Sequence, residues 1–113
     1  MTTSSPHKIC LFKKEDCAPC TGASEALDRV LERHPEYSYI VTVFKKENHP
    51  ALVAAYELEM YPTAIIFDVD THELARKIGG KFLTYDWWSA ALTAIHDRRN
   101  EGEASTNAAQ HDI

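Results

Sequence analysis

The 113-residue sequence has no apolar run long enough to cross a bilayer, and it has only three cysteines. A membrane-spanning helix needs about 20 consecutive apolar residues, so we expect no membrane partner. Three cysteines are too few for the disulfide framework of a small secreted domain. Residues 1–6 have neither the basic nor the apolar part of a secretory signal. We therefore expect a cytoplasmic protein, in whose reducing compartment cysteines serve catalysis or metal binding.

An excess of positive charge is also missing. The chain has 12 Lys and Arg against 17 Asp and Glu, which gives a net charge of −5. Three of the acids, Glu101, Glu103 and Asp112, follow the last basic residue, Arg99, and without them 14 acids face 12 bases, or −2. Binding to phosphate backbones needs a surplus of Lys and Arg, so we expect no nucleic-acid partner. The length and the 44% of hydrophobic residues predict one domain with one core.

Apolar spacing predicts four strands and three helices in the order βαβαββα. The expected strands are residues 7–13, 37–44, 63–68 and 73–78, and the helices follow Cys17, Asn48 and Thr84. Residues 7–13 are apolar on both alternating sides, which is typical of a strand covered on both faces. Residues 37–44 are rich in β-branched and aromatic side chains, which favours a central strand. Asn48 and Thr84 are side chains of the kind that cap helices.

The connections between these elements predict the fold class. A strand, a helix and a second strand favour a right-handed parallel crossover. The short turn at residues 70–72 makes the last two strands antiparallel. The expected fold is therefore α/β, a four-stranded mixed sheet flanked by three helices on its two faces. We expect a flexible N-terminus at residues 1–6, one domain at 7–99, and a disordered C-terminal tail at 100–113, which is polar and aperiodic.

Cys17 and Cys20 are the informative residues, because they lie between the first expected strand and the first helix. Unpaired N–H groups and the helix dipole at a helix N-terminus favour a thiolate and lower the pKa of Cys17 below about 8.5. The carboxylate of Asp16 opposes this, so we expect a moderate lowering. Cys20 lies one turn further on. The spacing allows Cys17 to attack a substrate disulfide and Cys20 to resolve the mixed disulfide.

Half of a zinc site is the main alternative for this pair of cysteines. Zinc needs two more ligands, and only Cys10 and scattered histidines remain, without a second CxxC or an HxxxH pair. We therefore expect no metal. Cys10 lies within the first expected strand, where a small core residue is the simpler interpretation. Trp87 and Trp88 are adjacent, so one is expected in the core and the other at the surface or against a partner.

The chain resembles the thioredoxin-fold proteins over residues 7–98. The resemblance is carried by Cys17-Ala18-Pro19-Cys20 after the first strand, Tyr61-Pro62-Thr63 before the third, and Gly79-Gly80 after the fourth. It implies a thioredoxin-like fold and a monomeric dithiol reductase that donates electrons to protein disulfides. It also implies that Pro62 is cis and lies against the cysteines, and that the Tyr61 backbone pairs with an extended substrate.

The resemblance also implies the site residues and partners. Cys17 and Cys20 would be catalytic, and the substrate groove would be formed by Ala18, Pro19, Tyr61, Pro62, Thr63, Gly79 and Gly80. No cofactor would be tightly bound, and reducing equivalents would come from a thioredoxin reductase with NADPH, or from glutathione. The substrates would be disulfide-containing proteins, with ribonucleotide reductase among the candidates.

Departures from the thioredoxin pattern keep two further functions open. Asp16 replaces the usual tryptophan, Leu11 the buried aspartate, and Val43 a lysine of the next strand. From the few residues before the first expected strand, we expect no counterpart of the first strand and helix of a thioredoxin, and this layout is similar to that of glutaredoxins. Lys81-Phe82 replaces the acidic pair that holds glutathione in glutaredoxins. The alternatives are a glutathione-dependent glutaredoxin, or a thioredoxin-like subunit of a larger complex in which the cysteines are dispensable.

Overall fold

The computed structural model describes residues 5–111, with side chains up to residue 100. Its elements are β1 (Lys8–Lys13), α1 (Ala18–Arg33), the 3₁₀ helix η1 (Pro35–Ile40), β2 (Val41–Lys45), the 3₁₀ turn η2 (Lys46–Asn48), α2 (Pro50–Ala55), β3 (Thr63–Phe67), β4 (Glu73–Ile78) and α3 (Tyr85–His111). Apart from the two 3₁₀ segments, this is the predicted order βαβαββα. The α/β fold class is therefore confirmed.

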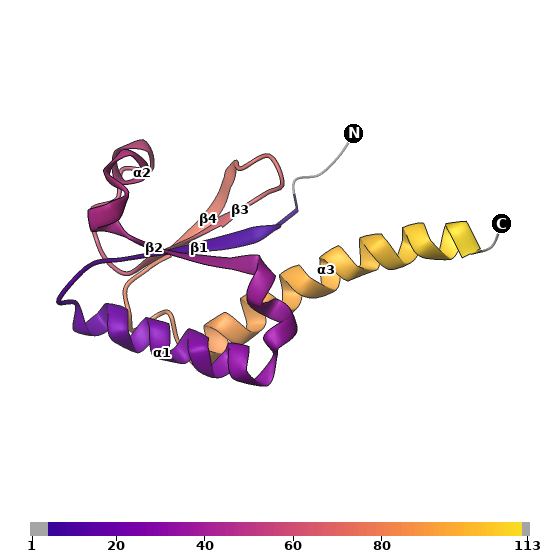
Figure 1. The fold of residues 1–113 in the computed structure, drawn as a ribbon, viewed down its shortest axis with the longest axis horizontal. Coiled ribbons are helices and arrows are strands. Elements are labelled where there is room, and N and C mark those ends of the chain that lie inside the picture. Colours follow the sequence, from indigo (N-terminus) through magenta and orange to yellow (C-terminus); the bar gives the residue numbers. More distant parts are fainter. Residues whose placement is uncertain (1–4, 112–113) are drawn as a thin grey trace.

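The four strands form one mixed sheet in the order β2-β1-β3-β4 (Figure 1). β1 pairs with β2 in parallel and with β3 in antiparallel, and β4 is antiparallel to β3. β1 is thus an inner strand, and residues 9–12 are all buried. This placement explains why residues 7–13 are apolar on both alternating sides.

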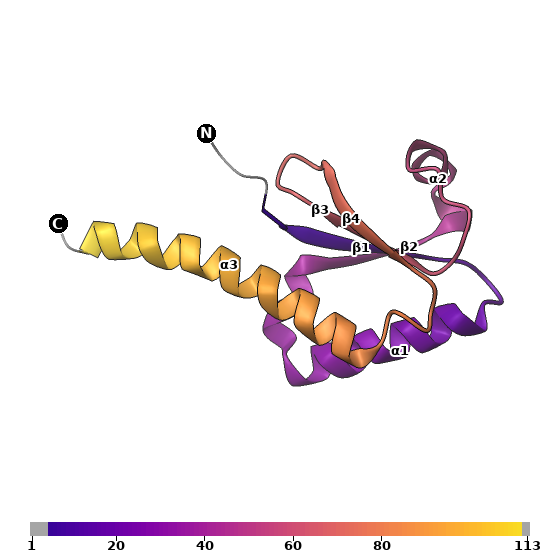
Figure 2. The ribbon, with the colours of Figure 1, turned by 180° about the vertical axis from the view of Figure 1, so that it is seen from behind.

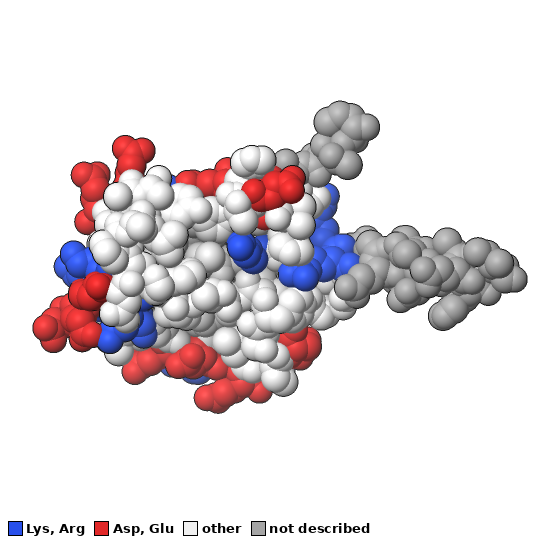
Figure 3. Space-filling model, turned by 45° about the horizontal axis from the view of Figure 1, so that its top comes forward, with Lys and Arg blue, Asp and Glu red and all other residues white. Residues whose placement is uncertain are grey.

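Helices cover both faces of the sheet. α1 and α3 lie side by side on one face, and α2 lies on the other (Figures 1 and 2). Alternation along β1 sends Ile9 and Leu11 toward α1 and α3, and sends Cys10 and Phe12 toward α2. The buried side chains therefore form two cores, one on each face of the sheet. In a view tilted toward the α2 side, acidic side chains lie mostly around the rim, and the middle is largely uncharged apart from a few Lys and Arg side chains on the half nearer the end of α3 (Figure 3).

The expectation of a central strand at residues 37–44 is wrong. β2 begins only at Val41 and lies at the edge of the sheet, and residues 35–40 form η1. Tyr37 and Ile40 are 5% and 1% exposed and belong to the core under α1 and α3. The Tyr37 hydroxyl and Thr93 Oγ1, 2.9 Å apart, share a hydrogen bond. The aromatic and β-branched content of this segment therefore reflects burial rather than a place inside the sheet.

Of the two predicted helix caps, one is confirmed. The Trp87 N–H donates to Thr84 Oγ1 at 3.1 Å, so Thr84 caps α3. Asn48 does not cap α2, because η2 ends at Asn48 and His49 precedes the helix without a side-chain hydrogen bond. Pro50 accounts for this start of α2, because the residue before a proline is disfavoured in the helical region and a proline is favoured at the first helical position, so that His49 and not Asn48 directly precedes the helix.

The two ends of the chain complete the comparison. Residues 1–4 and 112–113 lie outside the described residues. The backbone of α3 is helical to His111, which differs from the disordered tail expected at residues 100–113. Residues 100–111 hold no proline, and six of these twelve residues are Ala, Glu or Gln, whose helix propensities are high. Trp88 is fully buried and Trp87 is partly buried, which agrees with the expectation of one core and one outer tryptophan.

Within the described part of the chain, no helix is both long enough and apolar enough to span a bilayer.

Candidate active site

Cys17 and Cys20 form a disulfide at the N-terminus of α1, with Cα atoms 5.2 Å apart. Cys17 is the N-cap residue of the helix and is half-buried, and Cys20 is 2% exposed in the first turn. This is the position between β1 and α1 that the sequence predicts. The outer sulfur can therefore meet a substrate, while the inner one is shielded.

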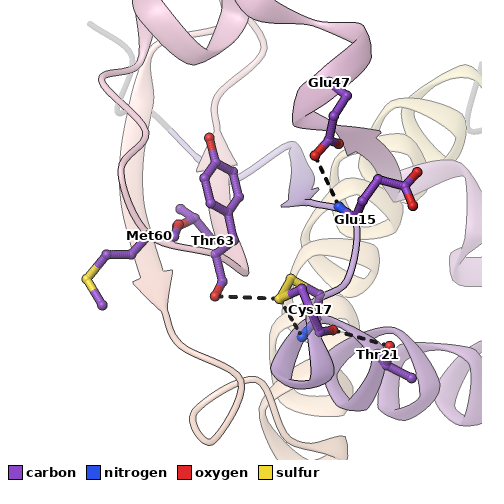
Figure 4. Close-up of a disulfide and its surroundings, with 8 residues drawn as sticks. Glu15, Cys17, Thr21, Glu47, Met60 and Thr63 are labelled. Carbon is purple, nitrogen blue, oxygen red and sulfur yellow. Dashed lines mark hydrogen bonds between the residues drawn. A yellow bond between two sulfur atoms is a disulfide. The ribbon is translucent and has the colours of Figure 1, made fainter.

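The first turn of α1 directs a hydrogen-bond donor at the sulfur of Cys17. The Cys20 N–H donates to Cys17 Sγ at 3.2 Å. The Cys17 carbonyl accepts from the Thr21 N–H at 3.1 Å and from the Thr21 hydroxyl at 3.3 Å, and Figure 4 shows the bond from the hydroxyl. Pro19 has no N–H and takes its place in this turn without leaving a donor unpaired. When the disulfide opens, this helix end favours negative charge on Cys17.

The loop before β3 lies against the same sulfur. The Tyr61–Pro62 peptide bond is cis, the isomer that the resemblance implies. The Tyr61 carbonyl oxygen is 4.0 Å from Cys17 Sγ (Figure 4). A disulfide sulfur carries no proton, so this is a van der Waals contact. After reduction, the Cys17 thiol can donate its proton to this oxygen. The backbone before Pro62 therefore borders the position at which a substrate sulfur would approach.

The Tyr61 side chain anchors this loop. Its ring packs against the core on the α2 side, and Lys46 Nζ lies 5.5 Å from the ring centroid. Its hydroxyl is shielded from solvent. Burial, and secondarily the nearby Glu47 carboxylate, raise the pKa of Tyr61. The side chain is thus held in place while the carbonyl of the same residue contacts Cys17.

Gly79 and Gly80 connect the cis-proline loop to the cysteine loop. The Gly79 N–H donates to the Pro62 carbonyl at 2.9 Å, and Gly79 has a φ of +106°, which favours glycine. A Cβ on Gly80 would lie 2.6 Å from the Pro19 carbonyl oxygen, so only glycine fits there without a shift of backbone. Three segments that are distant in sequence therefore meet at the disulfide.

The remaining groove residues differ in how they are placed. Ala18 and Pro19 are exposed beside Cys17, where an approaching protein could touch them. Thr63 is 1% exposed, and its hydroxyl donates to the Met60 carbonyl at 2.6 Å. The Thr63 side chain thus shapes the turn that holds Pro62 and does not form part of the surface.

Charged residues tie the loop before Cys17 to the end of β2, which sequence analysis did not predict. Glu15 forms an ion pair with Lys45, and its N–H donates to Glu47 Oε2 at 3.2 Å (Figure 4). The hydrogen bond from the Glu15 N–H lowers the pKa of Glu47, and the bond to the Glu15 carboxylate raises the pKa of Lys45. All three side chains are exposed, so these contacts orient the loop rather than stabilise the fold strongly. Residues 15 and 47 are far apart in sequence, and no local pattern indicates that they meet.

Cys10 lies apart from this site. It is a free cysteine, 7% exposed, in the core on the α2 side, where burial raises the pKa of its thiol. The expectation of a core residue is confirmed. Among the described residues, the one group spaced to hold a metal is Asp68, Asp70 and His72 at the β3–β4 turn, and it contains no cysteine.

Solved structures that share this fold include several thioredoxins. Thioredoxin-2 of the malaria parasite superposes with a TM-score of 0.61 at 17% identity, over 82% of this chain and 97% of that chain. Thioredoxin of Malassezia sympodialis gives 0.58 at 15% identity, over 75% and 70%. Thioredoxin of Fasciola hepatica gives 0.56 at 20% identity, over 75% and 76%. No family model and no curated protein matches the chain. At such identities the likeness shows a thioredoxin-like fold.

Proposed function

From this thioredoxin-like fold, we propose that the protein is a thiol–disulfide oxidoreductase that reduces disulfides of other proteins. The observation that carries the proposal is the environment of Cys17. Its half-buried sulfur lies at a helix N-terminus, accepts the Cys20 N–H, and is bordered by the backbone before a cis-proline. A helix N-terminus favours the thiolate, which is the nucleophilic form of cysteine.

The proposed reaction has two exchanges. The Cys17 thiolate attacks one sulfur of a substrate disulfide, and the other substrate sulfur leaves as a thiolate. Cys20 then loses its proton to water and attacks Cys17, which releases the second substrate thiolate and forms the Cys17–Cys20 disulfide. The substrate gains two electrons and the cysteine pair loses two. An extended substrate segment would pair with the Tyr61 backbone beside the sulfur, as in strand addition.

The physiological partners belong to the same proposal. We propose disulfide-containing protein substrates, a monomeric enzyme in the reducing cytoplasm, and reducing equivalents from a thioredoxin reductase with NADPH. Lys81 and Phe82 follow the Gly79-Gly80 pair, where an acidic pair would favour glutathione. Activity with thioredoxin reductase but not with glutathione is the expected result, and the reverse result would favour a glutaredoxin.

The test measures reduction of a disulfide-bonded reporter protein by the reduced enzyme. Cys17→Ser is expected to abolish the reaction, and Cys20→Ser to accumulate a mixed disulfide between Cys17 and the reporter. Cys10→Ala is the matched control, because it removes a thiol that lies outside the site. Equal activity of the Cys17 and Cys20 variants would contradict the proposal. Partner capture that survives both changes would instead favour a subunit of a larger complex.

The reduction potential of the pair tests the direction of the reaction. A value from about −270 to −200 mV is expected for a cytoplasmic reductant. A value near about −120 mV would indicate a disulfide-forming oxidant and would contradict both the direction and the compartment.

A further inference from the structure

Ser24 lies on α1, one turn after Cys20, and its hydroxyl oxygen has no hydrogen-bond partner. The oxygen is shielded from solvent, and no described residue bonds to it while the cysteines are oxidised. A serine inside a helix ordinarily bonds the carbonyl four residues earlier or points to solvent. A shielded hydroxyl without a partner costs free energy. The oxidised state of the protein therefore leaves this group unsatisfied.

Ser24 and Cys20 both line a groove beside the disulfide, between the loop before Cys17 and the first turns of α1. Residues four apart on a helix share one face, with Cβ atoms about 5–6 Å apart. In the oxidised state the Cys20 sulfur is bonded to Cys17. A disulfide sulfur is a weak acceptor, and the Ser24 hydroxyl makes no hydrogen bond to it in this state. When the disulfide opens, the Cys20 sulfur becomes a stronger acceptor, above all as a thiolate. The unsatisfied donor and the new acceptor then lie one helical turn apart.

Other groups are poorly placed to stabilise the inner sulfur. Leu11, which stands where thioredoxins have a buried aspartate, is apolar and fully buried on β1, so it offers no polar group. The charged side chains that line the groove are those of Lys13, Lys14, Glu15, Asp16, Glu25 and Lys45. All of them are exposed or half-exposed, and Glu15 is paired with Lys45. Ser24 is thus the groove residue with a shielded and unused donor.

We propose that the Ser24 hydroxyl donates a hydrogen bond to the Cys20 sulfur once the disulfide is open, and that Ser24 is a positioning residue for the resolving step. This rests on the proposed function. In the mixed disulfide, Cys20 gives its proton to water and its thiolate attacks the Cys17 sulfur. The Cys17–Cys20 bond forms, the bond from Cys17 to the substrate breaks, and the substrate leaves as a thiolate. The hydrogen bond stabilises and orients the attacking thiolate.

The proposal predicts the direction in which Ser24 shifts the dithiol–disulfide equilibrium, and a serine with a merely structural role would not shift it. The hydroxyl is unsatisfied in the disulfide state and satisfied in the dithiol state, so Ser24 favours the reduced protein. Ser24→Ala removes the penalty from one state and the hydrogen bond from the other. The equilibrium with a glutathione buffer is therefore expected to shift toward the protein disulfide by roughly three- to tenfold. A serine that only affects helix stability would change both states alike.

The experiment compares Ser24→Ala with Ser24→Thr, which keeps a hydroxyl, and with Ser89→Ala, which replaces a half-buried serine of α3. The first readout is the dithiol–disulfide equilibrium in graded glutathione buffers. The second is the rate at which iodoacetamide alkylates Cys20 in a Cys17→Ala background, measured by mass spectrometry of the peptide that contains Cys20. This second rate needs no substrate, so it remains informative if the protein reduces no disulfide.

In the second readout, Ser24→Ala is expected to slow alkylation of Cys20 roughly three- to tenfold at a pH where the thiol is mostly protonated. Ser24→Thr should remain near the unmodified chain in both readouts, and Ser89→Ala should change neither. The proposal would be overturned if Ser24→Ala stayed within twofold of its reference in both readouts, the reference being the unmodified chain in the first and the Cys17→Ala chain in the second. Failure of the proposed function has a different signature, in which the reporter protein is not reduced whatever residue 24 is.

Discussion

The backbone of Gly80 lies so close to Pro19 that a side chain at residue 80 has no room. A Cβ there would lie 2.6 Å from the Pro19 carbonyl oxygen and 2.8 Å from its Cβ. Gly79, the preceding residue, is hydrogen-bonded to the Pro62 carbonyl. The segment after β4 therefore sets the spacing between the cysteine loop and the cis-proline loop.

Gly80→Ala is expected to destabilise the protein by about 1–3 kcal/mol, because the added methyl forces backbone apart rather than a flexible side chain. Chemical denaturation measures this change. Gly22→Ala is the matched control, since Gly22 lies on α1 and a Cβ there meets nothing within 4 Å. Replacing this helical glycine should stabilise the protein by about 0.5–1 kcal/mol. Equal stability of the two variants would contradict the close approach of residues 80 and 19.

The hydroxyl of Thr63 is expected to stabilise the turn before Pro62. It donates to the Met60 carbonyl at 2.6 Å from a buried position. Thr63→Val keeps the shape of the side chain and removes the donor, so a loss of about 1 kcal/mol and a slower reaction are expected. Thermal unfolding and the reporter assay measure the two effects. Thr63→Ser keeps the donor and should recover most of the reaction rate, and a serine variant as slow as the valine variant would count against this role.

Arg76 holds the C-terminal end of α2, from which the chain runs toward the cis-proline. Its Nη2 donates to the Tyr56 carbonyl at 3.1 Å, and its Nε and Nη2 each donate to the Glu73 carboxylate at 2.6 Å. The hydrogen bonds from Arg76 to the Glu73 carboxylate lower the pKa of Glu73. The clamp joins β4 to the segment that positions Tyr61.

Because the folded pKa of Glu73 is depressed, its contribution to stability is present above the unfolded pKa of about 4.3 and is lost as pH falls through the folded pKa. Glu73→Gln is therefore expected to destabilise the protein at pH 7, by at most about 1 kcal/mol for this partly exposed pair. The difference between the two proteins should shrink toward about pH 3. Urea unfolding at both pH values measures it. A difference that is independent of pH would show that the carboxylate charge is not the cause.

The sequence predicts the elements best where one local interaction decides them. Thr84 caps α3 as expected, and the bounds of β4 are those that Gly79 and the turn at 70–72 predict. The strand expected at residues 37–44 begins only at Val41, because Tyr37 is buried against α3, a contact that strand propensity does not describe.

The candidate site also has features that the sequence predicts and features that depend on contacts between distant residues. The position of Cys17 follows from a strand and a helix that adjoin in sequence, and the isomer of Pro62 from the resemblance. The bond between the Glu15 N–H and Glu47 joins residues 32 positions apart, so no periodicity indicates it. The unsatisfied hydroxyl of Ser24 becomes visible only when the packing around it is known.

Cys10 is expected to remain unmodified when the folded, reduced protein meets an alkylating reagent. Burial raises the pKa of its thiol, with an opposing but smaller effect from Lys8. A raised pKa leaves the thiol protonated at neutral pH, and only the thiolate is a good nucleophile. Cys17 should therefore react with iodoacetamide roughly a hundredfold faster than Cys10 in the folded state. Peptide-resolved mass spectrometry separates the two rates.

Unfolding in urea is the control, because it exposes Cys10 and should bring the two rates together. A second variant tests the same burial without a reagent. Cys10→Ser places a hydroxyl among Phe12, Tyr56 and Phe67, and a shielded hydroxyl without a partner costs about 1–3 kcal/mol. Cys10→Ala places no polar atom there and should cost less than the serine. Rapid labelling of Cys10 in the folded protein, or a serine variant more stable than the alanine one, would mean that this side of the sheet is open to water and that Cys10 can take part in thiol exchange.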